Sequence, residues 1–247
     1  MKIKKWITNG LYFIVTLIAF SLSVFKLNNP VWIAAWIAPV FLIRFMRNNK
    51  WIFGIISSYL ILQTAVFIGI IPFLTMTDTI SVKVDFSFIL MMQIQSGMLF
   101  LPLLFLVPFI LDKALNNYLP GFAASLVYPT GVTAVELFSS LTFGTLSTFG
   151  ETQFALPPLA MISSLFGFFG VSFLVAWSAS MINYLWEENW NIKKLKYSGL
   201  AYVSILTAML IYGGTVPAFP KKAEKNVSIA GITLENGFFE RMAHSDM

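Results

Sequence analysis

The chain has 247 residues, of which 57% are hydrophobic and 11% are charged. Soluble domains contain about 25% charged residues, so this composition excludes an ordinary soluble protein. The sequence has no cysteine and a single histidine, His244, which excludes disulfides, thiolate chemistry and a cysteine or histidine metal centre. The net charge of +5 comes from short basic clusters between apolar segments. Such clusters are typical of topology determinants, so no nucleic-acid partner is expected.

Seven apolar segments follow one another along the chain, and each is long enough, or nearly so, to cross a membrane. The predicted spans cover residues 6–25, 31–46, 51–73, 86–111, 122–138, 159–184 and 200–216. The first segment also resembles a signal peptide, but an uncleaved span is favoured because further spans follow at once. The sequence therefore predicts an all-α integral membrane protein, with a bundle of about seven transmembrane helices over residues 1–218 and an external tail over residues 219–247.

The sixth segment, residues 159–184, carries no charge. At 1.5 Å per helical residue it would be roughly 39 Å long, which is enough to cross a hydrocarbon core of about 30 Å. Gly167 and Gly170 are three residues apart and would share one helix face, where small residues let another helix approach closely. We therefore expect a continuous helix in the core of the bundle.

The basic residues predict the orientation of the bundle. Most of them fall on the side of the N-terminus: Lys2, Lys4, Lys5, Arg44, Arg47, Lys50, Lys113, Lys193, Lys194 and Lys196. The short loops on the other side contain only Lys26 and Lys83. The positive-inside bias therefore places the N-terminus in the cytoplasm and, with seven spans, the C-terminus outside.

Two segments fall outside this regular pattern. Residues 141–158 are broken by Gly144, Gly150 and two prolines, yet contain phenylalanines that favour burial, so we expect a loop folded back onto the outer face of the bundle. Residues 227–234 (VSIAGITL) are typical of a strand that is apolar on both faces. A single strand is not stable by itself, so we expect it to open a domain that this sequence does not contain.

Three stretches, in this order, resemble the apolipoprotein N-acyltransferase family. Residues 30–40 (PVWIAAWIAPV), which lead to Arg44, are similar to the second span of that family. Residues 132–137 resemble a family segment with a glutamate near its outer end, here Glu136. The most specific stretch runs from Gln153 through residues 164–167 (SLFG) to residues 170–174 (GVSFL).

The resemblance implies an N-terminal helix bundle in the bacterial plasma membrane, followed by an external nitrilase-like domain whose first strand would be residues 227–234. It also implies transfer of an acyl chain from a membrane phospholipid, through a cysteine thioester, to the amino terminus of a lipoprotein. A lysine and a glutamate of the nitrilase-like domain would assist. Because the sequence has no cysteine, we expect this chain alone to be inactive and to contain no catalytic residue, with a separate hydrolase domain as a candidate partner.

Glu136 and Gln153 are the candidate residues for a lipid or substrate cavity. An intramembrane carboxylate is costly and often functional, although Glu136 lies close enough to a helix end for a structural role. Gln153 could equally serve in loop hydrogen bonding. No cofactor or metal is implied. Two alternatives stay open, a small membrane transporter and a non-enzymatic scaffold or partner subunit.

Overall fold

The computed structural model describes residues 2–26, 30–76, 87, 90, 91, 94, 98–119, 121–144 and 148–215. These residues are all-helical, which confirms the predicted class for this part of the chain. The helices are α1 (Lys2–Leu22), α2 (Trp32–Asn48), α3 (Trp51–Met76), α5 (Leu101–Leu115), α6 (Gly121–Phe143), the 3-10 helix η1 (Glu151–Gln153), α7 (Pro157–Glu187) and α8 (Ile192–Thr215). The predicted strand over residues 227–234 and the tail over residues 219–247 lie outside the described residues.

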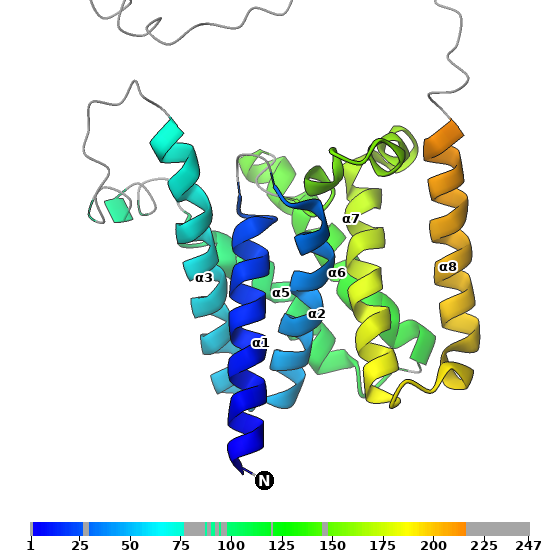
Figure 1. Cartoon of the computed structure of the whole chain (residues 1–247), viewed down its shortest axis with the longest axis horizontal. Helices are drawn as coiled ribbons and strands as arrows, with labels where there is room; N and C mark the ends of the chain where they lie inside the picture. Colours follow the sequence, from blue (N-terminus) through cyan, green and yellow to red (C-terminus); the bar gives the residue numbers. More distant parts are fainter. Residues whose placement is uncertain are drawn as a thin grey trace, which may run out of the picture.

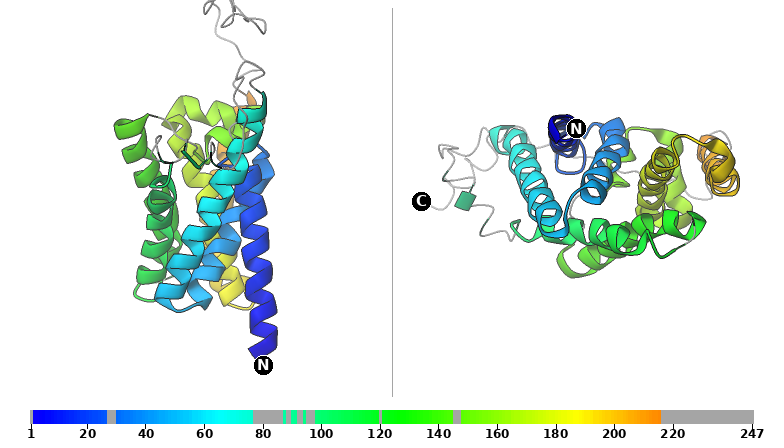
Figure 2. Two further views of the ribbon diagram at one scale, coloured as in Figure 1. Left: turned by 90° about the vertical axis from the view of Figure 1, so that its left-hand side faces the viewer. Right: turned by 90° about the horizontal axis from the view of Figure 1, so that it is seen from below.

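The helices form an up-and-down bundle (Figure 1). α1 packs against α2 and α3, whereas α7 packs against α2, α6 and α8. Seen from below, α3 and α8 lie at opposite ends of the bundle, with α1 and α2 on one side and α5 and α6 on the other (Figure 2). This arrangement brings the end of α2 and the ends of α5 and α7 to the same end of the bundle as the start of α1.

Apolar side chains both fill the interior and cover the outside of the bundle. The largest fully buried side chains include Phe20, Met46, Phe109 and Tyr128, which come from four different helices. Trp6 and Ile52 are each 75% exposed, as are many other large apolar side chains to a lesser degree. An exterior of this kind is stable in lipid rather than in water. The fold therefore has the character of a membrane protein.

Four of the described helices contain segments long and apolar enough to cross a membrane. They are Trp51–Ile71, Gly121–Thr142, Pro157–Glu187 and Lys196–Thr215. The apolar part of α1, Trp6–Leu22, is shorter, and α2 and α5 have 17 and 15 residues. The seven predicted spans thus correspond to seven α-helices in the described residues, of which four meet the length and composition of a membrane span.

The predicted fourth span ends too early. α5 continues through Asp112 and Lys113 to Leu115, whereas these two charges were expected to terminate the helix. The helix continues because Asp112 is turned into the bundle, where it is 1% exposed and pairs with Arg47. The beginning of α5 is set by Pro102, which favours the first turn of a helix. Residues 98–100 form a turn, so the predicted span over residues 86–111 is not one continuous helix. Most of residues 86–97 lie outside the described part of the chain.

The prediction of one continuous helix over residues 159–184 is wrong. α7 is interrupted at Gly167, whose φ of 64° and ψ of 179° are not helical. Only glycine adopts such a conformation at little cost, because it has no Cβ. A Cβ on Gly170 would meet the Phe166 side chain, so Gly167 and Gly170 do not form the predicted face for a neighbouring helix.

The interruption divides α7 into two parts with different roles. The part before Gly167 runs across the end of the bundle towards α8 (Figure 1), where Ser164 hydrogen-bonds Tyr212 at 3.1 Å. The part after Gly167 has 20 residues and is roughly 30 Å long, so it still matches the hydrocarbon core. Its residues 174–181 are all buried, which agrees with the predicted place of this helix in the bundle core.

Candidate functional site

The segment between α6 and α7 contains Gln153 and also Phe149, the backbone partner of Glu136. It runs from residue 144 through η1 to residue 156, and residues 144 and 148–156 of it are described. Phe149, Thr152 and Gln153 are buried, whereas Phe154 is 62% exposed. The expected folding of this loop back onto the bundle therefore holds for Phe149 and Gln153 but not for Phe154.

Glu136 anchors the start of this loop. Its Oε1 accepts a hydrogen bond from the backbone N–H of Phe149 at 2.9 Å, and Glu136 is 3% exposed. The next residue, Gly150, donates its backbone N–H to the Ser172 hydroxyl on α7 at 2.7 Å. Two consecutive backbone donors are thus satisfied by side chains of α6 and α7, as burial of an irregular segment requires.

Gly150 is needed for the close approach of the loop to α7. A Cβ at this position would overlap the backbone carbonyl of Phe168, just after the interruption of α7. The break at Gly167 and the glycine at position 150 therefore belong to one packing arrangement. This proximity could not be predicted from the sequence, because it is a tertiary contact.

η1 is stabilised by a reciprocal pair of hydrogen bonds. The Thr148 backbone N–H donates to Glu151 Oε2 at 3.0 Å, and the Glu151 backbone N–H donates to Thr148 Oγ1 at 3.1 Å. This is the bonding pattern of a capping box, in which a threonine and a glutamate lie three residues apart. This pair was not predicted, although the spacing of a threonine and a glutamate three residues apart is visible in the sequence.

Gln153 connects the loop to α2. It is fully buried, and its Oε1 accepts a hydrogen bond from Trp36 Nε1 at 2.9 Å. Its Nε2 donates to the Trp32 carbonyl at 3.1 Å and to the Thr152 hydroxyl at 2.7 Å. All these partners are protein groups, so the side chain acts as a polar link between the loop and the start of α2.

Glu136 faces a small internal cavity rather than a lipid-sized one. The cavity, of about 10 Å³, is lined by apolar and aromatic residues that include Phe109, Val132 and Phe149, together with Tyr128. Such a volume is at the lower limit for holding one water molecule and cannot hold an acyl chain. Glu136 Oε2 has no hydrogen-bond partner among the described residues. A role of Glu136 and Gln153 in a lipid cavity therefore stays a prediction.

The opposite end of the bundle contains a cluster of ion pairs that sequence reasoning missed. Arg47 on α2 donates to both oxygens of Asp112 on α5, at 2.8 and 2.6 Å, and lies 3.0 Å from Glu187 on α7. Arg44 reaches the same Glu187 at 3.3 Å. These arginines entered the sequence analysis only as topology determinants. The sequence does place an acid near the end of each of two other helices, at the same end of the bundle, and this could have indicated the ion pairs.

No group of three or more acidic or histidine side chains in the described ranges is arranged to hold a metal ion. Comparisons of the chain with known protein families, with curated proteins and with solved structures found no match.

Proposed function

We propose that this chain is the membrane part of an apolipoprotein N-acyltransferase-like protein. The observation that supports the proposal is that hydrogen bonds connect the three stretches on which the resemblance depends. The first and third stretches bond each other directly, and the second is connected to the third through loop residues 149 and 150. Gln153 of the third stretch bonds Trp36 and the Trp32 carbonyl of the first stretch. Glu136 of the second stretch bonds Phe149, and the adjacent Gly150 bonds Ser172 of the third.

These contacts join residues that are far apart in the sequence. Trp36 and Gln153 are separated by 117 positions, and Gly150 and Ser172 by 22. The hydrogen bonds are made by the side chains that distinguish the three stretches, not by general apolar packing. Buried polar networks of this kind define one specific arrangement of the segments that they connect. The three stretches would occur together because they fix this arrangement jointly.

In the proposed function the bundle supplies a site in the membrane and the chemistry belongs to a nitrilase-like domain. A cysteine of that domain would attack a phospholipid ester, so that the ester C–O bond breaks, a thioester C–S bond forms and the lysophospholipid leaves with the proton. The amine of a lipoprotein would then take the acyl group and return a proton to the sulfur. This chain has no cysteine and cannot form the thioester itself.

The same proposal includes the topology. Seven spans in a bacterial plasma membrane would place the basic end of the bundle in the cytoplasm and the loop with η1 outside, where the lipoprotein substrate would arrive. The distribution of Arg44, Arg47, Lys50 and Lys113 at the end opposite to η1 supports this orientation.

A reconstitution experiment tests the proposal. The purified chain is placed in nanodiscs, with or without a separately expressed, cysteine-containing nitrilase-like domain of the family, and acyl transfer from phospholipid to a lipopeptide amine is measured. We expect no transfer by the chain alone and transfer by the pair, reduced when Gln153→Leu loosens the loop. Transfer by the cysteine-free chain alone would contradict the proposal. Equal binding of the nitrilase-like domain to this bundle and to an unrelated membrane protein would also contradict it.

A further inference from the structure

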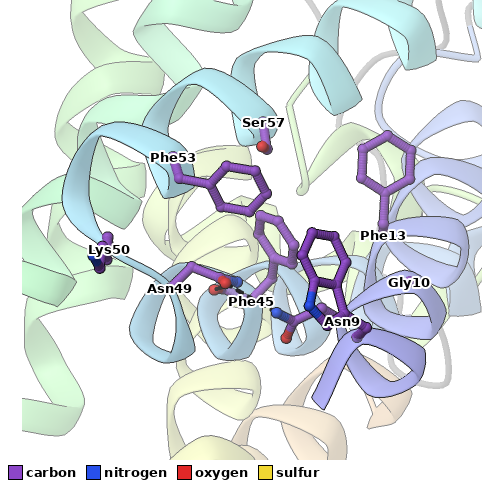
Figure 3. A pocket seen from close by; sticks show the side chains of 9 residues that line it. Asn9, Gly10, Phe13, Phe45, Asn49, Lys50, Phe53 and Ser57 are labelled. Carbon is purple, nitrogen blue, oxygen red and sulfur yellow. Dashed lines mark hydrogen bonds between the residues drawn. The ribbon is translucent and has the colours of Figure 1, made fainter. Parts of the chain in front are cut away.

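A larger pocket, of about 580 Å³, lies between α1, α2 and α3 at the basic end of the bundle (Figure 3). The aromatic rings of Phe13, Phe45 and Phe53 form its apolar part, and each comes from a different helix. Trp6, which is 75% exposed, lies nearer the start of α1. Binding sites for small ligands have volumes of about 300–1,000 Å³ and mainly apolar walls, and this pocket has both properties.

Three polar residues of the pocket, Asn9, Asn49 and Lys50, lie at one side of these rings, whereas Ser57 lies at the other side (Figure 3). Asn9 Nδ2 donates to Asn49 Oδ1 at 2.9 Å, which joins α1 to the end of α2 (Figure 3). Asn49 Nδ2 donates to the Phe45 carbonyl at 2.8 Å. Lys50, the next residue, is exposed and also lines the pocket. The pocket therefore combines an aromatic part with one polar and basic side, which Asn9, Asn49 and Lys50 form.

Among the described residues, Lys50 differs from the neighbouring cations because its side chain has no partner. Arg47 is paired with Asp112, and Arg44 with Glu187. Lys113 Nζ donates to the carbonyls of Met46 and Asn49. Within the described part of the chain, the side chain of Lys50 makes no hydrogen bond or ion pair. Its positive charge is available to a ligand.

We propose that this pocket binds one anionic phospholipid, with its phosphate beside Lys50 and part of an acyl chain against Phe13, Phe45 and Phe53. Residues 6–13 of α1 cover about 10 Å of the helix axis, which is the depth from a head group to the upper carbons of a chain. Tryptophan and lysine are the residues that anchor proteins at this level of the bilayer. The proposal concerns the end of the bundle opposite to η1 and does not depend on the proposed acyltransferase function.

Gly10 offers a way to fill the pocket without disturbing the bundle. A Cβ added to Gly10, which lines the pocket, would meet no atom within 4 Å. Gly10→Leu therefore places a larger side chain in the space that the acyl chain would use. Gly214 on α8 is the matched control, because a Cβ there also meets nothing within 4 Å. Lys193→Gln is the control for charge, since Lys193 is exposed and outside the pocket.

Native mass spectrometry of the full chain, with equimolar phosphatidylglycerol and phosphatidylethanolamine added in detergent, measures the binding. We expect one phosphatidylglycerol to be retained in preference to phosphatidylethanolamine. Lys50→Gln should lower phosphatidylglycerol retention about five-fold, which is the effect of one lysine near an anionic surface, and leave phosphatidylethanolamine unchanged. Gly10→Leu should lower the retention of both lipids, whereas Gly214→Leu and Lys193→Gln should match the wild type.

Three results would overturn the proposal. The first is that the wild type retains the two lipids equally. The second is that Lys50→Gln retains as much phosphatidylglycerol as Lys193→Gln does. The third is that Gly10→Leu retains as much of both lipids as Gly214→Leu does. If Gly10→Leu is not monodisperse, the comparison of Lys50→Gln with Lys193→Gln tests the proposal by itself. Both variants replace exposed side chains and should fold normally.

Discussion

The two ends of the bundle stabilise buried polar side chains by different interactions. Both contain buried polar side chains from helices that are distant in sequence. At the basic end Arg47 is 8% exposed and is balanced by two acids, Asp112 and Glu187. At the other end Glu136 has no cationic partner among the described residues and is bonded to a backbone amide. Charges hold helix ends together at one end, and side chains hold a backbone loop at the other.

This difference predicts different responses to substitution. Removal of one member of a buried ion pair leaves an uncompensated charge, which is strongly destabilising. Removal of a side chain that bonds a loop leaves an unsatisfied dipole, which costs less. The basic end should therefore be sensitive to single substitutions in its charges, and the loop should be sensitive to steric changes and to loss of hydrogen bonds.

The largest effect is expected from Asp112→Asn. The variant leaves the buried Arg47 without its bidentate partner, and we expect the free energy of unfolding to fall by about 3–5 kcal/mol. Unfolding by sodium dodecyl sulfate in mixed micelles measures this change. The double variant Arg47→Met, Asp112→Leu should recover much of the loss. If the double variant is as unstable as the sum of the single variants, the pair is not coupled as described.

Gly150→Ala should have the next largest effect. Its Cβ would overlap the Phe168 carbonyl, so the loop must move away from α7, at a cost of about 3 kcal/mol. Gly10→Ala is the control, because its Cβ meets no atom and alanine favours a helix. The two variants are compared by the same unfolding titration. Equal stability of the two would show that the loop does not approach α7 so closely.

Gln153→Leu should destabilise the protein by about 2 kcal/mol. The substitution removes the acceptor for Trp36 Nε1 and the side-chain donor to the Trp32 carbonyl. In a double-mutant cycle with Trp36→Phe, the second substitution should cost much less in the Gln153→Leu background than in the wild type. Additive costs would mean that this hydrogen bond contributes nothing to stability.

The smallest effect is expected from Glu136→Gln. Glutamine keeps an oxygen that accepts from the Phe149 backbone N–H, so stability should change by less than about 1 kcal/mol. Glu136→Leu loses this acceptor and should cost about 1–2 kcal/mol. Co-purifying phospholipid, counted per protein, separates the two roles of this residue. Loss of lipid in Glu136→Gln at unchanged stability would support a lipid contact, whereas unchanged lipid would leave Glu136 as a loop anchor.

Much of the fold could be predicted because hydrophobic runs and turn residues are local signals. Pro30 follows two asparagines, and α2 begins two residues later, at Trp32. The interruption at Gly167 could not be predicted, because a glycine in an apolar run is equally typical of close helix packing. The interruption lies next to Phe168, whose carbonyl Gly150 approaches closely, and this tertiary contact has no local signal in the sequence.

The candidate site was predictable only in part. Glu136 and Gln153 stand out as polar residues in apolar surroundings, which marks them from the sequence alone. Their partners are a backbone amide 13 residues away and an indole 117 residues away, and no local pattern identifies these. The pairing of Arg47 with Asp112 was missed for the same reason, since 65 positions separate them.

Labelling of introduced cysteines tests most directly the claim that the two ends face opposite sides of the membrane. The chain has no cysteine, so single substitutions give no background. Phe154→Cys reports on the loop with η1, where residue 154 is 62% exposed, and Asn191→Cys reports on the exposed turn between α7 and α8 at the basic end. With an impermeant maleimide, we expect position 154 to react in intact cells and position 191 only after lysis. Labelling of position 191 in sealed cells, or protection of position 154, would contradict the account.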